Sequence, residues 1–420
     1  MNPFNEKPMK IQDSFVDWST LYCKSYDPRE VDPYTKTRVI LMNGTEYEAQ
    51  WFSRQFSRHC NNQDIRRALA MTRRVEQQQQ KQIAVTKPID ESILETTISY
   101  EQLAVDLTAT LAQNEPDPYI KKALDFALLE DFDHLYRYAD LLQMDMGVKA
   151  EELVGKYTEI TPGRPTISEH RCPFDNIRYP MSAANSQLIS KLNVGIITAA
   201  EQQTMNYYMN VAGFYDNSYG RRLYQEIGLI EEQHVSHYES LQDPNCTWLE
   251  MLLMHEYTEC YLYYSCMQDE TNDHLRPMWE RHFAEEIAHL HNAAELLKTY
   301  ENKEWQQVIP DGEFPKLLNF NSNIDYIREV LATTVRDTAV LENYSDVNNL
   351  PDDADFFAFQ EKLNADVETV PSHIVIKKYI GKKGKDYRYE TEENPVEELR
   401  DRKKDNTTVG RVKEKANLKA

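Results

Sequence analysis

Glutamate and histidine residues recur in this sequence at spacings that suit metal binding. In the second half of the chain they are Glu201, Glu231, His234, Glu256, Glu286 and His289. Two of the pairs are Glu-x-x-His, so each imidazole lies on the same helix face as a carboxylate, about one turn away. One metal ion could take the imidazole while the carboxylate bridges to a second ion. Oxygen ligands with one imidazole per metal favour iron or manganese.

The same series occurs 155 residues earlier in the chain, with no gap needed at any position. There it reads Glu46, Glu76, Gln79, Glu101, Asp131 and His134. The helix starts repeat too: Ser92 with Glu95 and Thr247 with Glu250 both have capping-box spacing, nine residues before Glu101 and Glu256. Shared spacing of ligands and caps predicts an internal duplication.

The first-half series departs from the second at two positions. Gln79 stands where the second half has a histidine, and Asp131 stands where it has a glutamate. These ligands are therefore expected to bind metal weakly or not at all, and buried ion pairs are the alternative for both halves. The candidate metal ligands are Glu201, Glu231, His234, Glu256, Glu286, His289, Glu101, Asp131, His134, Glu46 and Glu76.

Composition excludes several classes of function. The formal net charge of -22 disfavours a nucleic-acid partner, because phosphates would be repelled. The six cysteines include no C-x-x-C pair, which argues against a zinc ribbon and suits a reducing compartment. The first residues lack the apolar core of a signal peptide, and no run of about 18 apolar residues occurs. We expect a cytoplasmic protein with no membrane contact.

Helical periodicity dominates the chain, so the expected fold class is all-α. Helices are predicted at roughly 44–60, 64–84, 92–113, 118–144, 190–214, 219–241, 247–268 and 275–300, with two more near 321–345 and 352–367. The best strand candidate is 373–380. The expected organisation is an irregular segment 1–43, a first repeat 44–144, a long crossover 145–189, a second repeat 190–300, a helical extension 301–380 and a charged, mostly disordered tail 381–420.

The ligand pattern resembles that of the ferritin-like superfamily, which includes rubrerythrins, bacterioferritins and manganese catalases. The resemblance rests on Glu201, Glu231-x-x-His234, Glu256 and Glu286-x-x-His289, and covers about residues 40–300. It implies duplicated helical hairpins that form two four-helix-bundle units, with two iron or manganese ions per site. Rubrerythrins carry a further ligand glutamate one turn beyond the lone one, where this sequence has Glu259.

Two arrangements of the hairpins remain open. In the tandem arrangement each half of the chain makes its own bundle. However, only about six residues join the helix ending near Leu241 to the cap Thr247, and they reach roughly 20 Å. If these two helices ran parallel, the connection would have to return along both helix segments, which needs about 28 Å. The two helices are therefore expected to be antiparallel. The long crossover fits only between Asp131 and Glu201, which favours a crossed arrangement that places Glu201 beside Glu101 and Glu256 beside Glu46.

The resemblance implies a non-haem dimetal oxidoreductase of the peroxidase, catalase or oxidase type, acting on dioxygen or peroxide. An external electron donor is expected unless the cycle is self-sufficient, and a homo-oligomer is possible. The alternative is a non-catalytic ferritin-like metal-storage or helical scaffold protein.

Overall fold

The protein is described by a computed structural model that places residues 1–164, 170–364, 366–389 and 392–400. The described chain is mostly helical, as expected. Its α-helices are α1 (Trp18–Leu21), α2 (Pro33–His59), α3 (Gln63–Val85), α4 (Ile93–Asn114), α5 (Pro118–Met146), α6 (Ala150–Val154), α7 (Leu188–Ala212), α8 (Ser218–Glu239), α9 (Trp248–Asp269), α10 (Arg276–Glu301), α11 (Ile324–Thr334), α12 (Asp355–Asn364) and α13 (Pro371–Lys383).

Short polar turns join the long helices into four hairpins: α2 with α3, α4 with α5, α7 with α8, and α9 with α10. The side chains of Asn62, Asp117 and Asn217 accept hydrogen bonds from the first backbone N–H groups of α3, α5 and α8. Both capping boxes predicted from the sequence form, at Ser92 and at Thr247. These caps satisfy backbone donors that a helix start leaves unpaired, and so fix where each helix begins.

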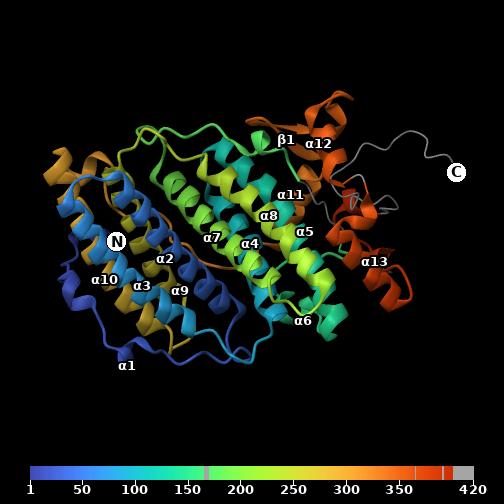
Figure 1. The fold of residues 1–420 in the computed structure, drawn as a ribbon, viewed down its shortest axis with the longest axis horizontal. Helices are drawn as coiled ribbons and strands as arrows, with labels where there is room; N and C mark the ends of the chain where they lie inside the picture. Colours follow the sequence, from blue (N-terminus) through green and yellow to red (C-terminus); the bar gives the residue numbers. More distant parts are fainter. Residues whose placement is uncertain (165–169, 365, 390–391, 401–420) are drawn as a thin grey trace.

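The hairpins associate in the crossed arrangement, and the tandem alternative is wrong. The α4–α5 hairpin packs on the α7–α8 hairpin, through contacts of α4 with α7 and of α5 with α8. The α2–α3 hairpin packs on the α9–α10 hairpin, through contacts of α2 with α9 and of α3 with α10. We call these sets the first helix group (α4, α5, α7, α8) and the second helix group (α2, α3, α9, α10). Helices α2 and α7 pack across the boundary between them (Figure 1).

The first helix group is the more deeply buried, because it lies between the second group and the C-terminal elements (Figure 1). Helix α4 is buried along almost its whole length, as is most of α5. No helix of the described residues is both long enough and apolar enough to cross a membrane.

Three expectations about the ends of the chain need correction. Helix α2 begins at Pro33, so part of the segment 1–43 is helical; proline is well suited to a helix's first turn. The strand candidate 373–380 lies inside α13, where Val375, Ile376 and Tyr379 form a buried stripe at helical spacing. The tail is ordered beyond 381, since Tyr387 and Val396 are buried; residues 390–391 and 401–420 lie outside the described ones.

An antiparallel hairpin replaces the second half of the helix expected at 321–345. Helix α11 ends at Thr334, and β1 (Asp337–Val340) then pairs with β2 (Asn343–Asp346). The β-branched run Thr333, Thr334 and Val335 disfavours helix continuation, because these side chains lose rotamer freedom in a helix.

Candidate metal centres

The first helix group brings six predicted ligands to one place, which we call the first centre. They are Glu101 on α4, Asp131 and His134 on α5, Glu201 on α7, and Glu231 and His234 on α8. None is more than 1% exposed. Ligand atoms of Glu101, His134 and Glu231 all lie within 4.8 Å of one another, and so do those of Asp131, Glu201 and His234. The two triads supply one imidazole each.

The ring of His234 is oriented by residues on both of its edges. Its Nδ1 faces the carboxylates of the centre, 3.4 Å from Asp131, 3.6 Å from Glu201 and 3.3 Å from Glu231. Its Nε2 lies 2.9 Å from Glu130 Oε2. A histidine that donates one ring N–H to a carboxylate presents its other nitrogen as a lone pair, which is the usual arrangement of a metal-bound imidazole.

Arg171, from the connection between α5 and α7, completes this arrangement. Its Nη1 donates to Glu130 Oε2 at 2.5 Å, and its backbone N–H donates to Gln233 at 2.8 Å. Burial alone would raise the pKa of Glu130, but the charges and hydrogen bonds of Arg171 and His234 together outweigh it and lower that pKa to about 2. Glu130 is therefore ionised at neutral pH and holds the His234 ring in place. No sequence motif indicates this contact, because Arg171 and Glu130 are 41 residues apart in the chain.

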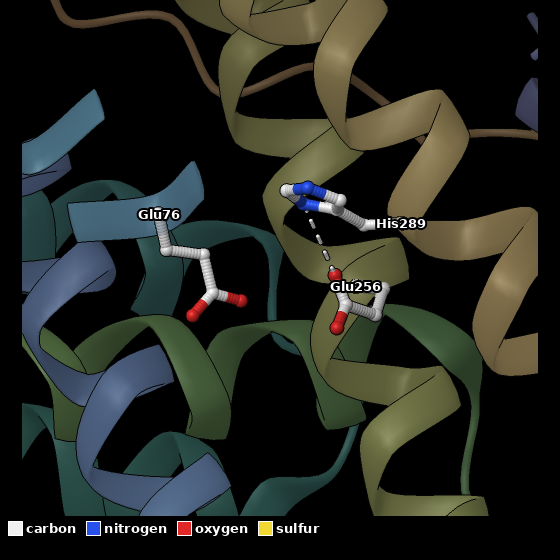
Figure 2. Close-up of side chains that lie close together, drawn as sticks. All are labelled: Glu76, Glu256 and His289. Atoms are coloured by element: carbon white, nitrogen blue, oxygen red, sulfur yellow. Dashed lines mark ion pairs between the residues drawn. The ribbon is translucent and has the colours of Figure 1, made fainter. Parts of the chain in front are cut away.

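The second helix group gathers the other predicted ligands into the second centre. Ligand atoms of Glu76 on α3, Glu256 on α9 and His289 on α10 lie within 4.8 Å of one another. Figure 2 shows Glu76 facing Glu256 and His289 across the space between their helices. Glu286 lies beside them, with its Oε2 3.0 Å from His289 Nδ1, and Glu259 joins Glu256 and Glu286 in a second set of three.

Glu46 on α2 borders the second centre. It belongs to neither set of three, but the neighbouring Glu286 and Glu76 charges add to burial in raising its pKa well above the usual range. All eleven predicted ligands are thus in or beside the two centres. Each centre combines helices from both halves of the chain.

Gln79 is the clearest difference between the two centres. It occupies the position on α3 that corresponds to His234 on α8, and its Nε2 donates to Glu286 Oε1 at 2.6 Å. Glu285 holds the position on α10 that corresponds to Glu130 on α5, and burial raises its pKa to about 7 although the Arg281 charge lowers it. The second centre therefore has a carboxylate at the position of Glu130, although it has no second imidazole.

A tyrosine donates to one carboxylate of each centre. The Tyr208 hydroxyl donates to Glu101 Oε1, and the Tyr263 hydroxyl donates to Glu46 Oε1. Each tyrosine follows by seven residues the lone glutamate of its own helix, Glu201 or Glu256. Their abundance near the ligands was visible in the sequence, but their partners lie on other helices. Glu101 Oε2 and Glu46 Oε2 are left with no hydrogen-bond partner among the described residues.

Unpartnered atoms show that these residues fit a bound cation. In the described chain, no hydrogen bond reaches either carboxylate oxygen of Asp131, Glu201, Glu231 or Glu259. His134 Nδ1 lies 2.9 Å from Glu231 Oε1, but the two are not aligned for a hydrogen bond. Buried polar atoms without partners destabilise a fold. Converging buried carboxylate and imidazole atoms are a donor set that divalent metal ions satisfy.

The raised pKa values of several carboxyl groups in the metal-free protein also indicate that these sites suit a bound cation. Burial, followed by the Glu231 charge, raises the pKa of Glu101 well above its usual range, and burial with the Glu201 charge does so for Asp131. Burial raises the pKa of Glu201 to about 7 and that of Glu76 to about 8. Contacts with His134 and His234 instead lower the pKa of Glu231, against the effect of burial. Without a metal, Glu101 and Asp131 therefore keep their protons at neutral pH, and binding of a metal there must release them.

Comparison of the chain with protein-family models, with curated proteins and with solved structures gave no match.

The double substitution Glu231→Ala with Glu286→Ala tests both centres together. We expect it to abolish stoichiometric iron or manganese binding while the helices stay folded, because each change removes a carboxylate at the middle of one centre. Metal analysis and circular dichroism give the two readings.

The matched control is Glu232→Ala with Glu295→Ala, which makes the same charge change at exposed positions on α8 and α10. It should keep the native metal content. Full retention of metal by the Glu231/Glu286 variant would refute the assignment of the centres.

Replacing Gln79 by histidine tests whether the second centre lacks only an imidazole. Gln79→His should tighten metal binding at the second centre by about tenfold or more, because Glu285 corresponds in position to Glu130, which lies 2.9 Å from the ring of His234. Metal titration against a competing chelator measures the change. The control Gln77→His, which places the same residue two positions earlier on α3, should have no effect; equal affinities for both variants would contradict the correspondence of Gln79 with His234.

The stability of the metal-free protein should fall as the pH rises from about 4.5 to about 8. Glu76 and Glu201 have folded-state pKa values of about 8 and about 7, above their ordinary value of 4.5, so the folded chain holds protons that the unfolded chain loses. Urea unfolding in the presence of a chelator at pH 6 and pH 8 measures this. A variant with Glu76→Gln and Glu201→Gln should lose part of the difference, and an undiminished difference would show that these groups are not its source.

Proposed function

We propose that the chain is a ferritin-like protein with two dimetal carboxylate centres, and that it acts as a non-haem oxidoreductase on dioxygen or peroxide. The observation that carries the proposal is the ligand set of the first centre. Four carboxylates and two histidines from four helices converge there, and all are buried. This is the donor set expected of two metal ions in a helix bundle, one lone carboxylate and one acid-x-x-His pair from each hairpin.

The proposal includes the duplication. Each half of the chain would contribute one hairpin to each of two four-helix bundles, which explains why the crossed contacts of α4 with α7 and of α2 with α9 occur together. It also explains the shared capping boxes at Ser92 and Thr247.

A pair of iron or manganese ions would supply binding and redox chemistry toward an O–O bond. The chain's own residues prepare the centre for it. Arg171 and Glu130 hold the His234 ring so that Nδ1 faces the carboxylates. Tyr208 holds one oxygen of Glu101 by a hydrogen bond and leaves the other without a partner. The Tyr208 hydroxyl is also the nearest proton donor to that carboxylate in the described hydrogen bonds.

Burial serves the same chemistry by excluding bulk water. The ligands of the first centre are surrounded by buried aromatic side chains, among them Tyr138 and Tyr238. Small, uncharged reactants such as dioxygen and hydrogen peroxide suit a centre enclosed in this way. Charged or large reactants would have to displace packed side chains.

The test is to load metal-free protein with iron(II), or with manganese(II), and to follow dioxygen and hydrogen peroxide consumption by electrode. We expect consumption of many equivalents per metal pair, supported by an added reductant where dioxygen is used, and none in the Glu231→Ala, Glu286→Ala variant. Consumption that stops after one equivalent per metal pair would support the storage function instead. Absence of metal binding would refute both.

A further inference from the structure

A cavity of about 530 Å³ lies at the boundary between the two helix groups. Its walls come from α2, α7, α8 and α9, the helices that meet there. This volume is within the range of pockets that enclose small organic molecules. Neither proposed reactant, dioxygen or peroxide, needs a space of this size.

The walls of the cavity are mainly apolar. Trp51, Phe52 and Trp248 supply aromatic surface, and Met251 and Met254 supply flexible thioether side chains. Phe52 and Trp248 lie with ring centroids 5.7 Å apart. Trp51 is 41% exposed, which is unusual for so large an apolar side chain and places it on the solvent side of the cavity. An apolar molecule bound here would cover surface that water now contacts.

The inner end of the cavity is formed by Glu259. This residue is fully buried, and neither carboxylate oxygen has a hydrogen-bond partner among the described residues. It lines the cavity and also belongs to the set of three with Glu256 and Glu286. Glu259 therefore connects the lining of the cavity with the second centre.

The outer end of the cavity carries acidic groups. Glu239 is an exposed lining residue and Asp243 is a half-buried one, and backbone N–H groups of Ala183 and Asn245 help to lower the pKa of Asp243. A third acid, Glu250, is neutralised by Lys303 at 2.8 Å. Lys191 is the counter-charge on this side, and burial lowers its pKa. The excess of carboxylates disfavours an anionic ligand, while the Trp51 ring could receive a cation.

We propose that this cavity binds a mainly apolar organic molecule, neutral or cationic at its outer end, and delivers it to the second centre. The inference rests on the proposed function, because it takes the second centre to hold metal. The two centres would then differ in the molecules that have access to them, because only the second adjoins this cavity of organic-ligand size.

Gly195 on α7 offers a way to fill the cavity without disturbing the fold. It lines the cavity, and a β-carbon built on it would meet nothing within 4 Å. Gly381 on α13 has the same free space and lies outside the cavity lining. The variants Gly195→Phe and Gly381→Phe are therefore a matched pair, and each replaces a helical glycine by a residue with better helix propensity. Gly195→Met is a smaller second choice if the phenylalanine variant fails to fold.

The first experiment measures binding without metal. Metal-free protein is titrated with 1-decanol, decyltrimethylammonium and decanoate, each below its micelle concentration, by calorimetry and by the fluorescence of Trp51 and Trp248. We expect the alcohol and the cation to bind the native chain and Gly381→Phe alike, and to bind Gly195→Phe at least about tenfold more weakly. Decanoate should bind the native chain about tenfold more weakly than the cation.

Equal binding to Gly195→Phe and to the native chain, or tighter binding of decanoate than of the cation, would overturn the proposal. Since no metal is present in this experiment, its outcome is independent of the proposed function. A chain that binds metal and consumes peroxide but does not bind these probes refutes the cavity inference alone.

The second experiment tests the connection to the second centre. The Glu231→Ala variant, in which only the second centre keeps its ligands intact, is loaded with manganese(II), and its electron paramagnetic resonance spectrum is recorded with and without 1-decanol. We expect the alcohol to change the spectrum, and the added Gly195→Phe substitution to remove that change. Bound alcohol that leaves the spectrum unaltered would show that the cavity does not reach the centre.

Discussion

Burial of clustered carboxylates is the constraint on which the rest of this structure depends. The two centres place acidic side chains in the interior of a helical protein, where an uncompensated charge is very costly. Within the described part of the chain, the ion pairs of these carboxylates are with histidines rather than with lysine or arginine. In the metal-free protein most of these carboxyl groups have raised pKa values and are protonated more readily, whereas histidine partners lower the pKa of Glu231. A bound cation would compensate the negative charge directly. The long, well-capped helices keep the ligands in place in either state.

The connection between α5 and α7 has two roles in this arrangement. Its length allows the α7–α8 hairpin to reach the α4–α5 hairpin, so that each centre draws on both halves of the chain. It also carries Arg171 to the buried edge of the first centre, where the guanidinium ionises Glu130 and thereby orients His234. A segment that appears to be a spacer in the sequence is thus part of the support of a ligand.

The two centres differ in their side chains and in their surroundings. The first has two imidazoles, and its four carboxylates include the shorter Asp131. The second has one imidazole and Gln79, together with the additional buried Glu259, which lines a cavity between the helix groups.

The sequence by itself determined most of the long helices, the caps that begin several of them, and the acidic and histidine positions that the fold brings together. Those properties depend on local interactions: 3.6-residue periodicity, caps within four residues, and acid-x-x-His pairs on one face. Loop length also favoured the crossed pairing of the hairpins, because the number of residues in a loop limits the distance that the loop can span. Only the tertiary structure decided that pairing, the Arg171–Glu130–His234 arrangement, the tyrosine donors and the cavity beside Glu259. Each of these joins helices that are distant in the chain, and side-chain packing between them leaves no period or motif in a single sequence. The β-hairpin after α11 was missed for a related reason, since short strands are stabilised mainly by the partner against which they pair.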